Sequence, residues 1–215
     1  MNPRMAVPRL QLLTDTHLQQ RYTALELAQF ARSAGADAVQ YREKQQSTTQ
    51  QVHTLQQLHA LLQGSSTQLI VNDRPDWAAA LPGAGAHVGL EDSPPQQARK
   101  TLGPGRLLGA TVHSLAELEA IAQLPAGTVD YIGVGPVFGT TSKNTGLPPL
   151  GLSGLREICN LSSIPVVAIG SITPHTLRPV LDTGAYGVAV LAAFCLAADP
   201  AAVAAELLHL LAPYR

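Results

Sequence analysis

The sequence predicts a single domain of the α/β class with a (β/α)8 TIM-barrel fold over residues 1–215. Short apolar runs alternate with amphipathic segments eight times along the chain, as repeated strand–helix units do. Several runs, such as residues 166–169, are continuously apolar, which is typical of parallel strands covered on both faces. Connections are short, and a Gly-containing turn recurs before strands, where we expect Gly to cap the preceding helix. The turns are Ala34-Gly-Ala, Pro82-Gly-Ala, Pro125-Ala-Gly and Thr183-Gly-Ala. Eight such units close most simply into a barrel.

The first half of the chain predicts four strand–helix units. The opening run ends at Asp15, and the helical pattern that follows stops before Gly35, a common helix terminator. The Gln-rich segment has valine and leucines at helical spacing and stops before Gly64. The expected strands are residues 9–14, 36–42, 68–72 and 86–90, and the expected helices are residues 25–33, 48–62, 76–81 and 95–101.

The second half repeats the pattern. Ser114-Leu-Ala-Glu117 has the spacing of a capping box and predicts a helix start. A doubly wound open sheet is the alternative architecture, but the Gly-x-Gly-x-x-Gly turn that such sheets carry after their first strand is missing. The expected strands are residues 106–110, 130–134, 164–169 and 187–191. One helix is expected to begin at Ser114, and the other expected helices are residues 154–159, 174–182 and 200–211.

Composition excludes several classes of protein. With 46% hydrophobic and 13% charged residues the chain is globular, and its net charge of −1 lacks the basic excess of a nucleic-acid binder. No apolar stretch reaches membrane-spanning length. Cys159 and Cys195 lie in apolar segments without metal-ligand spacing, which favours free thiols in a reducing compartment. We therefore expect a cytoplasmic protein with small-molecule partners, no nucleic acid and no membrane; the sequence leaves homo-oligomerisation open.

Polar residues gather at the carboxyl ends of the expected strands, where TIM-barrel active sites lie. Gln40, Arg42 and Lys44 alternate along one strand end and therefore share the face toward the barrel mouth. Two cations and an amide donor aimed at one site suit a multiply charged anion such as a diphosphate. The alternative is an ordinary solvated strand end paired with Glu43.

Asp73 and Asp92 follow two neighbouring strands, so we expect their carboxylates to lie close together at the rim. Two carboxylates beside an anion-binding patch suit Mg²⁺, which takes oxygen ligands and bridges carboxylates to substrate phosphates. A general acid/base pair, or salt bridges to Arg74 and Lys44, are the alternatives.

The segment 131–143 passes from an apolar strand into a loop with Thr140, Thr141, Ser142 and Lys143, which suits an anion. No Gly-x-Ser-x-Gly elbow is present and no cysteine is placed as a nucleophile, so covalent catalysis is disfavoured. The histidines lack metal-ligand spacing. His113 could touch a substrate, although a structural role is commoner at such a position.

Several motifs in register resemble the thiamine phosphate synthase family, from about Leu10 nearly to the C-terminus. The family has a TIM-barrel fold and joins hydroxymethylpyrimidine diphosphate to a thiazole phosphate, releasing pyrophosphate, with Mg²⁺ as cofactor. The motifs are Leu13-Thr-Asp15, Gln40-Tyr-Arg-Glu-Lys44, Asn72-Asp-Arg74, His87-Val-Gly-Leu-Glu-Asp92, Tyr131-Ile-Gly-Val-Gly-Pro-Val-Phe138 with Thr140 and Lys143, and Val166-Val-Ala-Ile-Gly170.

By matching positions, the resemblance implies a role for each candidate residue. Asp73 and Asp92 would hold Mg²⁺. The family is thought to pass through a pyrimidine carbocation, which needs electrostatic stabilisation and no protein nucleophile. The pyrimidine diphosphate would be held by Gln40, Asn72 and Thr111 together with the catalytic residues Arg42, Lys44 and Lys143. Thr140 and Ser142 would meet the thiazole phosphate, with Ser171, Leu191 and Ala192 at the phosphate site after the last two strands, and Thr141 is a further substrate-binding position.

The Lys143 role leads to a first prediction. Lys143→Ala should cut turnover by about 100-fold or more, because a cation facing the leaving diphosphate would be lost, while the fold stays intact. Steady-state turnover and a thermal melt check both parts. Near-normal turnover in the variant would contradict the role.

The chain departs from the family pattern on the thiazole-phosphate side. Ser171 stands where the family usually has Gly, and Ala192 where it usually has Ser. Away from this side, Leu90 stands where Gln is frequent in the motif that ends at Asp92. Ser171 supplies a hydroxyl but can crowd the approach of a phosphate to the backbone, and Ala192 lacks a hydroxyl donor. These departures predict weak affinity for the thiazole phosphate or a modified second substrate, which a normal Michaelis constant for that substrate would disprove.

Three other functions agree less well with the sequence. The related thiazole tautomerase carries a His where this chain has Pro136, and it lacks the paired aspartates. A non-catalytic thiazole-phosphate binder would need no complete diphosphate and metal site. A phosphosugar isomerase is suggested by fold analogy alone.

Overall fold

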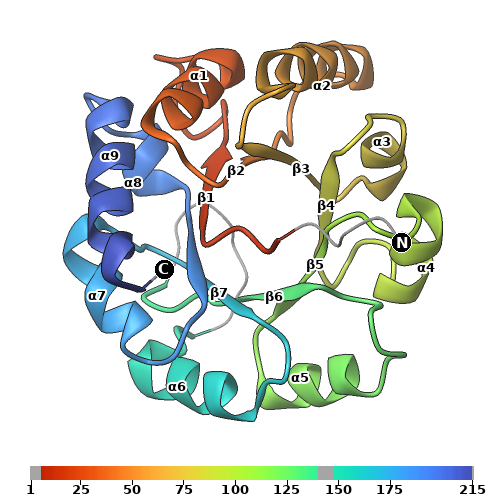
Figure 1. Cartoon of the computed structure of the whole chain (residues 1–215), viewed down its shortest axis with the longest axis vertical. Coiled ribbons are helices and arrows are strands. Elements are labelled where there is room, and N and C mark those ends of the chain that lie inside the picture. Colours follow the sequence, from red (N-terminus) through yellow and green to blue (C-terminus); the bar gives the residue numbers. More distant parts are fainter. Residues whose placement is uncertain (1–5, 140–147, 215) are drawn as a thin grey trace.

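The computed structural model describes residues 6–139 and 148–214, which form a closed barrel of eight parallel strands in sequential order. Figure 1 looks along the barrel, with the helices arranged around it. Neighbouring strands stay in register, for example Leu13 opposite Gln40. The predicted (β/α)8 barrel is therefore confirmed. The strands are β1 Leu10–Thr14, β2 Ala38–Tyr41, β3 Gln68–Asn72, β4 Gly85–Val88, β5 Leu108–Val112, β6 Tyr131–Val134, β7 Val166–Ile169 and β8 Gly187–Val190.

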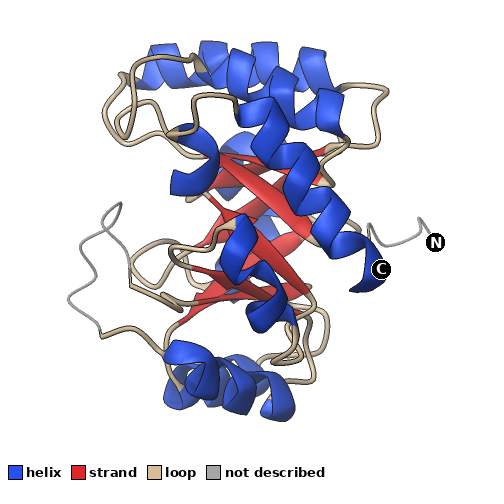
Figure 2. Cartoon of the chain, turned by 90° about the vertical axis from the view of Figure 1, so that its left-hand side faces the viewer, coloured by secondary structure: helices blue, strands red, loops and turns tan. Residues whose placement is uncertain are grey.

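The helices surround the strands, as Figure 2 shows from the side. Helix α1 has the reciprocal Thr23–Glu26 capping box at its start and left-handed Gly35 (φ 88°) at its end. The helices are α1 Ala24–Ala34, α2 Thr48–Leu62, α3 Pro75–Ala79, α4 Pro95–Leu102, α5 Leu115–Ala122, α6 Gly151–Leu161, α7 Pro174–Leu181, α8 Ala192–Cys195 and α9 Pro200–Leu211, followed by a 3₁₀ turn, η1 Ala212–Tyr214.

Alternation along each strand divides the core into two parts. Outward residues such as Leu10 and Leu12 pack in a large cluster with the helices, whereas Leu13 and Tyr131 belong to a small cluster inside the barrel. Residues 6–9 run across the barrel end that faces the viewer in Figure 1, where Val7 packs against the inner cluster. The strands' carboxyl ends lie at the other end, where the cavity described below opens.

The structure corrects several details. The short helix α8 was not predicted, because four residues after a buried strand carry no helical period. Strand β5 begins two residues later than expected, and the Arg106 guanidinium before it donates to the carbonyls of Ala78 (2.6 Å) and Leu81 (2.8 Å). Only half of the predicted capping box forms, because the Glu117 carboxylate accepts from the His113 N–H rather than from Ser114.

The glycine turns are only partly helix caps. Gly35 is the C-cap residue of α1, whereas Gly83, Gly127 and Gly184 turn the chain with positive φ farther from the helix ends. Helix α2 is capped by Gln63 rather than Gly64. Each turn still needs the left-handed conformation that Gly adopts without a steric penalty.

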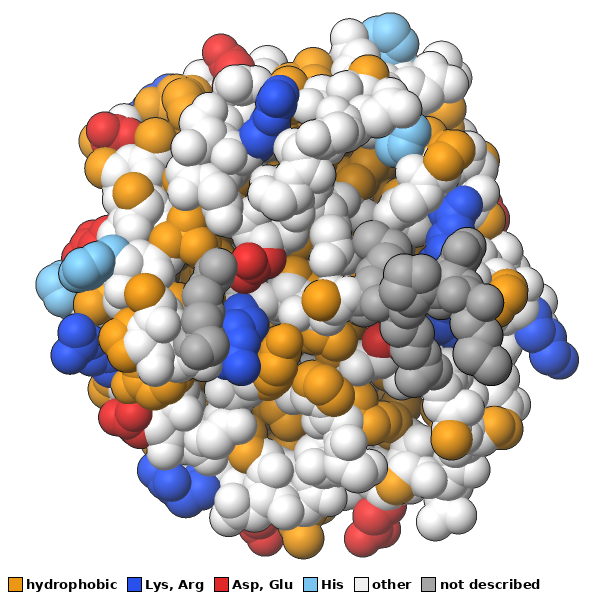
Figure 3. Space-filling view, in the orientation of Figure 1, with side chains coloured by type: hydrophobic (Ala, Val, Ile, Leu, Met, Phe, Trp, Pro, Cys, Tyr) orange, Lys and Arg blue, Asp and Glu red, His pale blue; other side chains and the backbone are white. Residues whose placement is uncertain are grey.

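The surface and the thiols agree with the composition. Charged side chains are scattered over the face shown in Figure 3, without a patch of one sign. None of the helices among the described residues is long and apolar enough to cross a membrane. Cys159 and Cys195 are both free, as predicted.

Candidate active site

A cavity of about 160 Å³ opens at the carboxyl ends of the strands. This is where the sequence placed the candidate residues, and most of them line it. Asp92 lies beside Asp73 at its rim, and Thr140, Thr141, Ser142 and Lys143 fall outside the described residues. The predicted residues that line the cavity are Gln40, Arg42, Lys44, Asn72, Asp73, Thr111, Ser171, Leu191 and Ala192.

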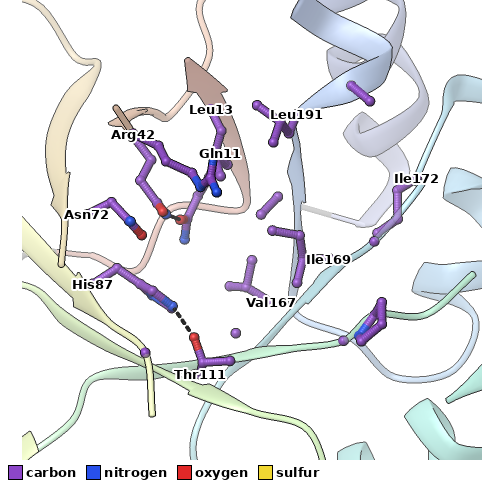
Figure 4. A pocket seen from close by; sticks show the side chains of 18 of the residues that line it. Gln11, Leu13, Arg42, Asn72, His87, Thr111, Val167, Ile169, Ile172 and Leu191 are labelled. Atoms are coloured by element: carbon purple, nitrogen blue, oxygen red, sulfur yellow. Dashed lines mark hydrogen bonds between the residues drawn. The ribbon is translucent and has the colours of Figure 1, made fainter. Parts of the chain in front are cut away.

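The cavity has a polar wall and an apolar wall, and Figure 4 shows the two facing each other. The polar wall comes from β1 to β5 and the apolar wall mainly from β7 and β8. An arrangement of this kind can hold one hydrogen-bonding ring and one less polar ring side by side. The polar wall includes Gln11, Arg42, Asn72, His87 and Thr111, and the apolar wall includes Val167, Ile169, Ile172 and Leu191.

Arg42 is held by a carboxylate from the neighbouring strand. The buried Asp15 pairs with the Arg42 guanidinium through Oδ2, and its Oδ1 accepts from the backbone N–H groups of His17 (2.9 Å) and Leu18 (3.2 Å). The pair is almost enclosed, with side-chain exposures of 14% for Arg42 and 3% for Asp15. A cation fixed in this way faces the cavity with little freedom to reorganise.

Glu43 fixes the backbone of the same strand end instead of neutralising its cations. Burial opposes its ionisation, but hydrogen bonds from Thr16 and from the backbone of Gln45, Gln46 and Lys44 outweigh burial and lower the pKa of Glu43. Its Oε1 accepts from the Lys44 N–H at 2.9 Å. Arg42 pairs with Asp15 and Lys44 with Asp73, so the ion pairs at this strand end are made with carboxylates other than that of Glu43.

Asp73 and Asp92 come together at the rim, as the strand order predicted. Burial and then a hydrogen bond with Asp73 raise the pKa of Asp92, while the Lys44 charge opposes this shift. Lys44 forms an ion pair with Asp73, whereas Arg74 pairs with the exposed Asp76 instead. Asp73 has a left-handed backbone (φ 65°), a strained conformation of the kind that clusters at functional sites.

Sequence reasoning missed a buried hydrogen-bonded cluster on the cavity floor. Gln11 Oε1 accepts from Gln40 Nε2 (3.1 Å) and from the Tyr131 hydroxyl (3.3 Å). His87 joins the hydroxyl groups of Tyr131 (Nδ1, 3.1 Å) and Thr111 (Nε2, 2.9 Å). The available signal was a polar residue at an inward position of an otherwise apolar strand, which is Gln11 in β1.

The two residues that differ from the family pattern on the thiazole-phosphate side, Ser171 and Ala192, lie on the other side of the cavity. Ser171 has a left-handed backbone (φ 50°), and its hydroxyl donates to the Gly139 carbonyl at 3.1 Å. Ala192 is the first residue of α8. His113 also lines the cavity, and its ring Nδ1 lies 3.3 Å from the Glu117 carboxylate.

Known proteins with similar sequences and structures bear out the resemblance. A family model described as "Thiamine monophosphate synthase" matches residues 10–194. The chain is 41% identical over 200 residues to the thiamine-phosphate synthase of Chloroflexus aurantiacus, covering 93% of this chain and 90% of that protein. It is 39% identical over 208 residues to the one from Albidiferax ferrireducens, covering 97% and 94% of the two chains.

A solved structure agrees with these relatives. The thiamine phosphate pyrophosphorylase from Pyrococcus furiosus superposes with a TM-score of 0.83 at 33% identity, covering 96% of both chains. A 3-hexulose-6-phosphate synthase at 16% identity (TM-score 0.65) shares the fold alone. Together with the geometry of the cavity, these matches show that the chain belongs to the thiamine monophosphate synthase family.

Proposed function

We propose that this protein is a thiamine-phosphate synthase that joins hydroxymethylpyrimidine diphosphate to a thiazole phosphate. The observation that carries the proposal is the rim of the cavity, where Arg42 and Lys44 stand beside the Asp73–Asp92 pair. Neither a tautomerase nor a simple binder needs two cations and two carboxylates at one edge. The polar and apolar walls then provide places for two different rings.

The Asp73–Asp92 pair fits Mg²⁺ by its chemistry. Its donors are carboxylate oxygens, which this ion prefers, and the two carboxyl groups lie within hydrogen-bonding reach of each other; burial and then the Asp73 carboxyl group raise the pKa of Asp92. Within residues 6–139 and 148–214 no group of three or more His, Cys, Asp or Glu side chains could hold a metal. A two-carboxylate site suits Mg²⁺, which keeps waters and takes its other ligands from substrate phosphates.

The reaction breaks one C–O bond and forms one C–N bond. The diphosphate leaves the pyrimidine methylene carbon with the bonding electron pair, and the thiazole nitrogen donates its lone pair to that carbon. Bound Mg²⁺ would stabilise the negative charge on the leaving group. Arg42, Lys44 and Lys143 would hold the same oxygens, and the enclosed Arg42–Asp15 pair would keep one of these cations in place before the reaction starts.

The two walls would orient the rings. The polar wall offers hydrogen bonds to the aminopyrimidine, and the apolar wall packs against the thiazole and keeps water from the reacting carbon. No protein nucleophile is required, in agreement with Cys195, whose thiol is buried and has its pKa raised to about 12 by burial.

A coupled assay tests the proposal. Purified protein with Mg²⁺ and both substrates should release pyrophosphate and form thiamine phosphate in equal amounts, and a chelator should stop both. Tautomerisation without coupling would favour the tautomerase, and binding of the thiazole phosphate without turnover would favour the non-catalytic binder.

Ser171→Gly is expected to lower the Michaelis constant for the thiazole phosphate by about threefold to tenfold, because it removes a side chain that can crowd the phosphate. The variant should also be more stable by about 1 kcal/mol, since Gly adopts a left-handed backbone without strain. Kinetics with each substrate and urea unfolding check the two parts. An unchanged or higher Michaelis constant would show that Ser171 contributes a useful hydroxyl.

A further inference from the structure

Gln11 is a buried polar residue on the inner wall of the barrel. It lies in β1 between the outward-facing Leu10 and Leu12, has 0% of its surface exposed, and lines the cavity. Figure 4 shows it on the polar wall near Arg42. Its amide nitrogen, Nε2, finds no hydrogen-bond partner in the described part of the chain. Buried amide groups are almost always paired, so an unpaired one beside a cavity points to a missing acceptor.

The surrounding hydrogen bonds show which atom of the Gln11 amide has no hydrogen-bond partner among the described residues. Gln11 Oε1 can only accept, so the Gln40 amide and the Tyr131 hydroxyl are donors to it. Because the only proton of the Tyr131 hydroxyl is used in this way, His87 must donate to that oxygen through Nδ1–H. In the neutral ring, His87 Nε2 then accepts from Thr111.

The observed orientation of the two amides gives the cluster its direction. Gln11 Oε1 accepts both bonds, and turning over the Gln11 amide alone would place its NH₂ against the Gln40 NH₂. In this orientation the unused capacity at Gln11 is a donor, and its partner is a hydrogen-bond acceptor.

We propose that Gln11 Nε2 donates to a ring nitrogen of the pyrimidine substrate, which makes Gln11 a specificity-determining residue. This inference rests on the proposed function. Gln40 lies opposite Leu13, two residues further along β1 than Gln11, and Arg42 lies two residues beyond Gln40 toward the mouth. A ring attached to a diphosphate at Arg42 would extend inward, toward Gln11. The thiazole offers fewer acceptors, and its nitrogen must stay free to attack.

The test combines a variant with altered substrates. Gln11→Met keeps a side chain of similar length and removes the donor; Gln11→Leu serves if that variant does not fold. The probes are the pyrimidine diphosphate and two pyridine analogues, each with one ring nitrogen replaced by C–H. Their Kd values are measured by calorimetry in the presence of Mg²⁺, beside a thermal melt.

Wild-type protein should bind one of the two analogues about tenfold or more weakly than the pyrimidine, because the analogue leaves the Gln11 donor unpaired. Gln11→Met should bind the pyrimidine about tenfold more weakly than wild type and bind that analogue no worse than it binds the pyrimidine. Its Michaelis constant for the thiazole phosphate should stay within about twofold of wild type.

Tyr131→Phe is the matched control, because it removes two bonds of the same cluster, to Gln11 and to His87, and leaves the Gln11 amide in place. It should keep a severalfold preference for the pyrimidine. Equal binding of pyrimidine and analogues by the wild type, or an undiminished preference in Gln11→Met, would overturn the inference. If wild-type protein forms no thiamine phosphate, the proposed function is wrong. If it turns over but binds the pyrimidine diphosphate no more tightly than the pyridine analogues, only the proposed role of Gln11 is wrong.

Discussion

Asp73→Asn and Asp92→Asn are each expected to lower kcat about 100-fold or more at saturating substrates, because each removes a carboxylate from the proposed Mg²⁺ site. Asn is a suitable replacement at position 73, since it tolerates the left-handed backbone found there (φ 65°). The Mg²⁺ concentration for half-maximal activity should rise in both variants. Turnover measured across a Mg²⁺ series checks both effects.

The same variants separate function from stability. The folded-state pKa of Asp92 is raised above its ordinary value of 3.8, so the folded protein holds this proton to higher pH than the unfolded chain does. Stability from this group is therefore present at low pH and is lost as the pH rises through the folded pKa. Without Mg²⁺ at neutral pH, Asp92→Asn should melt at the same temperature as wild type or about one to two degrees higher.

Glu91→Gln is the matched control for this pair, because it removes an exposed carboxylate from the neighbouring position. It should leave turnover within about twofold and the Mg²⁺ requirement unchanged. Asp73 and Asp92 variants that respond to Mg²⁺ as wild type does would contradict the metal site. A large fall in melting temperature would instead indicate a structural role for the pair.

Asp15→Asn is expected to have the second-largest effect, on both stability and turnover. The Asn oxygen can still accept from the His17 and Leu18 N–H groups, but its NH₂ would face the Arg42 guanidinium in place of a carboxylate. Leaving one partner of an enclosed ion pair uncompensated costs about 3 kcal/mol. Because Arg42 would also lose its fixed position, kcat should fall about tenfold or more. Urea unfolding and steady-state kinetics measure the two losses.

The chain offers a matched control for Asp15→Asn. Asp76→Asn makes the same chemical change in the Arg74–Asp76 pair, whose side chains are 43% and 49% exposed. Exposed pairs contribute little, so this variant should lose less than about 1 kcal/mol and keep its turnover. Similar losses in the two variants would show that enclosure of the Asp15–Arg42 pair is not what makes it important.

The barrel itself could be predicted from the chain. The alternation of apolar runs and helical periods is a local property, and the strand count and short connections leave one simple closure. The motif that begins at Gln40 and the placement of Asp73 and Asp92 at neighbouring strand ends followed from the two-residue period and the strand order. Errors were confined to element ends and to α8, where few residues carry a periodic signal.

The sequence by itself determined the fold, the edge of the barrel at which the candidate site residues meet, and the family. Tertiary structure alone decided the partners: Arg42 with Asp15, Lys44 with Asp73, and the Gln11 cluster on the cavity floor. The physical reason is that periodicity tells which face of a strand a side chain occupies, whereas hydrogen bonds and ion pairs depend on which residues of other strands reach the same point. Gln11 and Tyr131 are 120 residues apart in the chain, and only closure of the barrel brings them together.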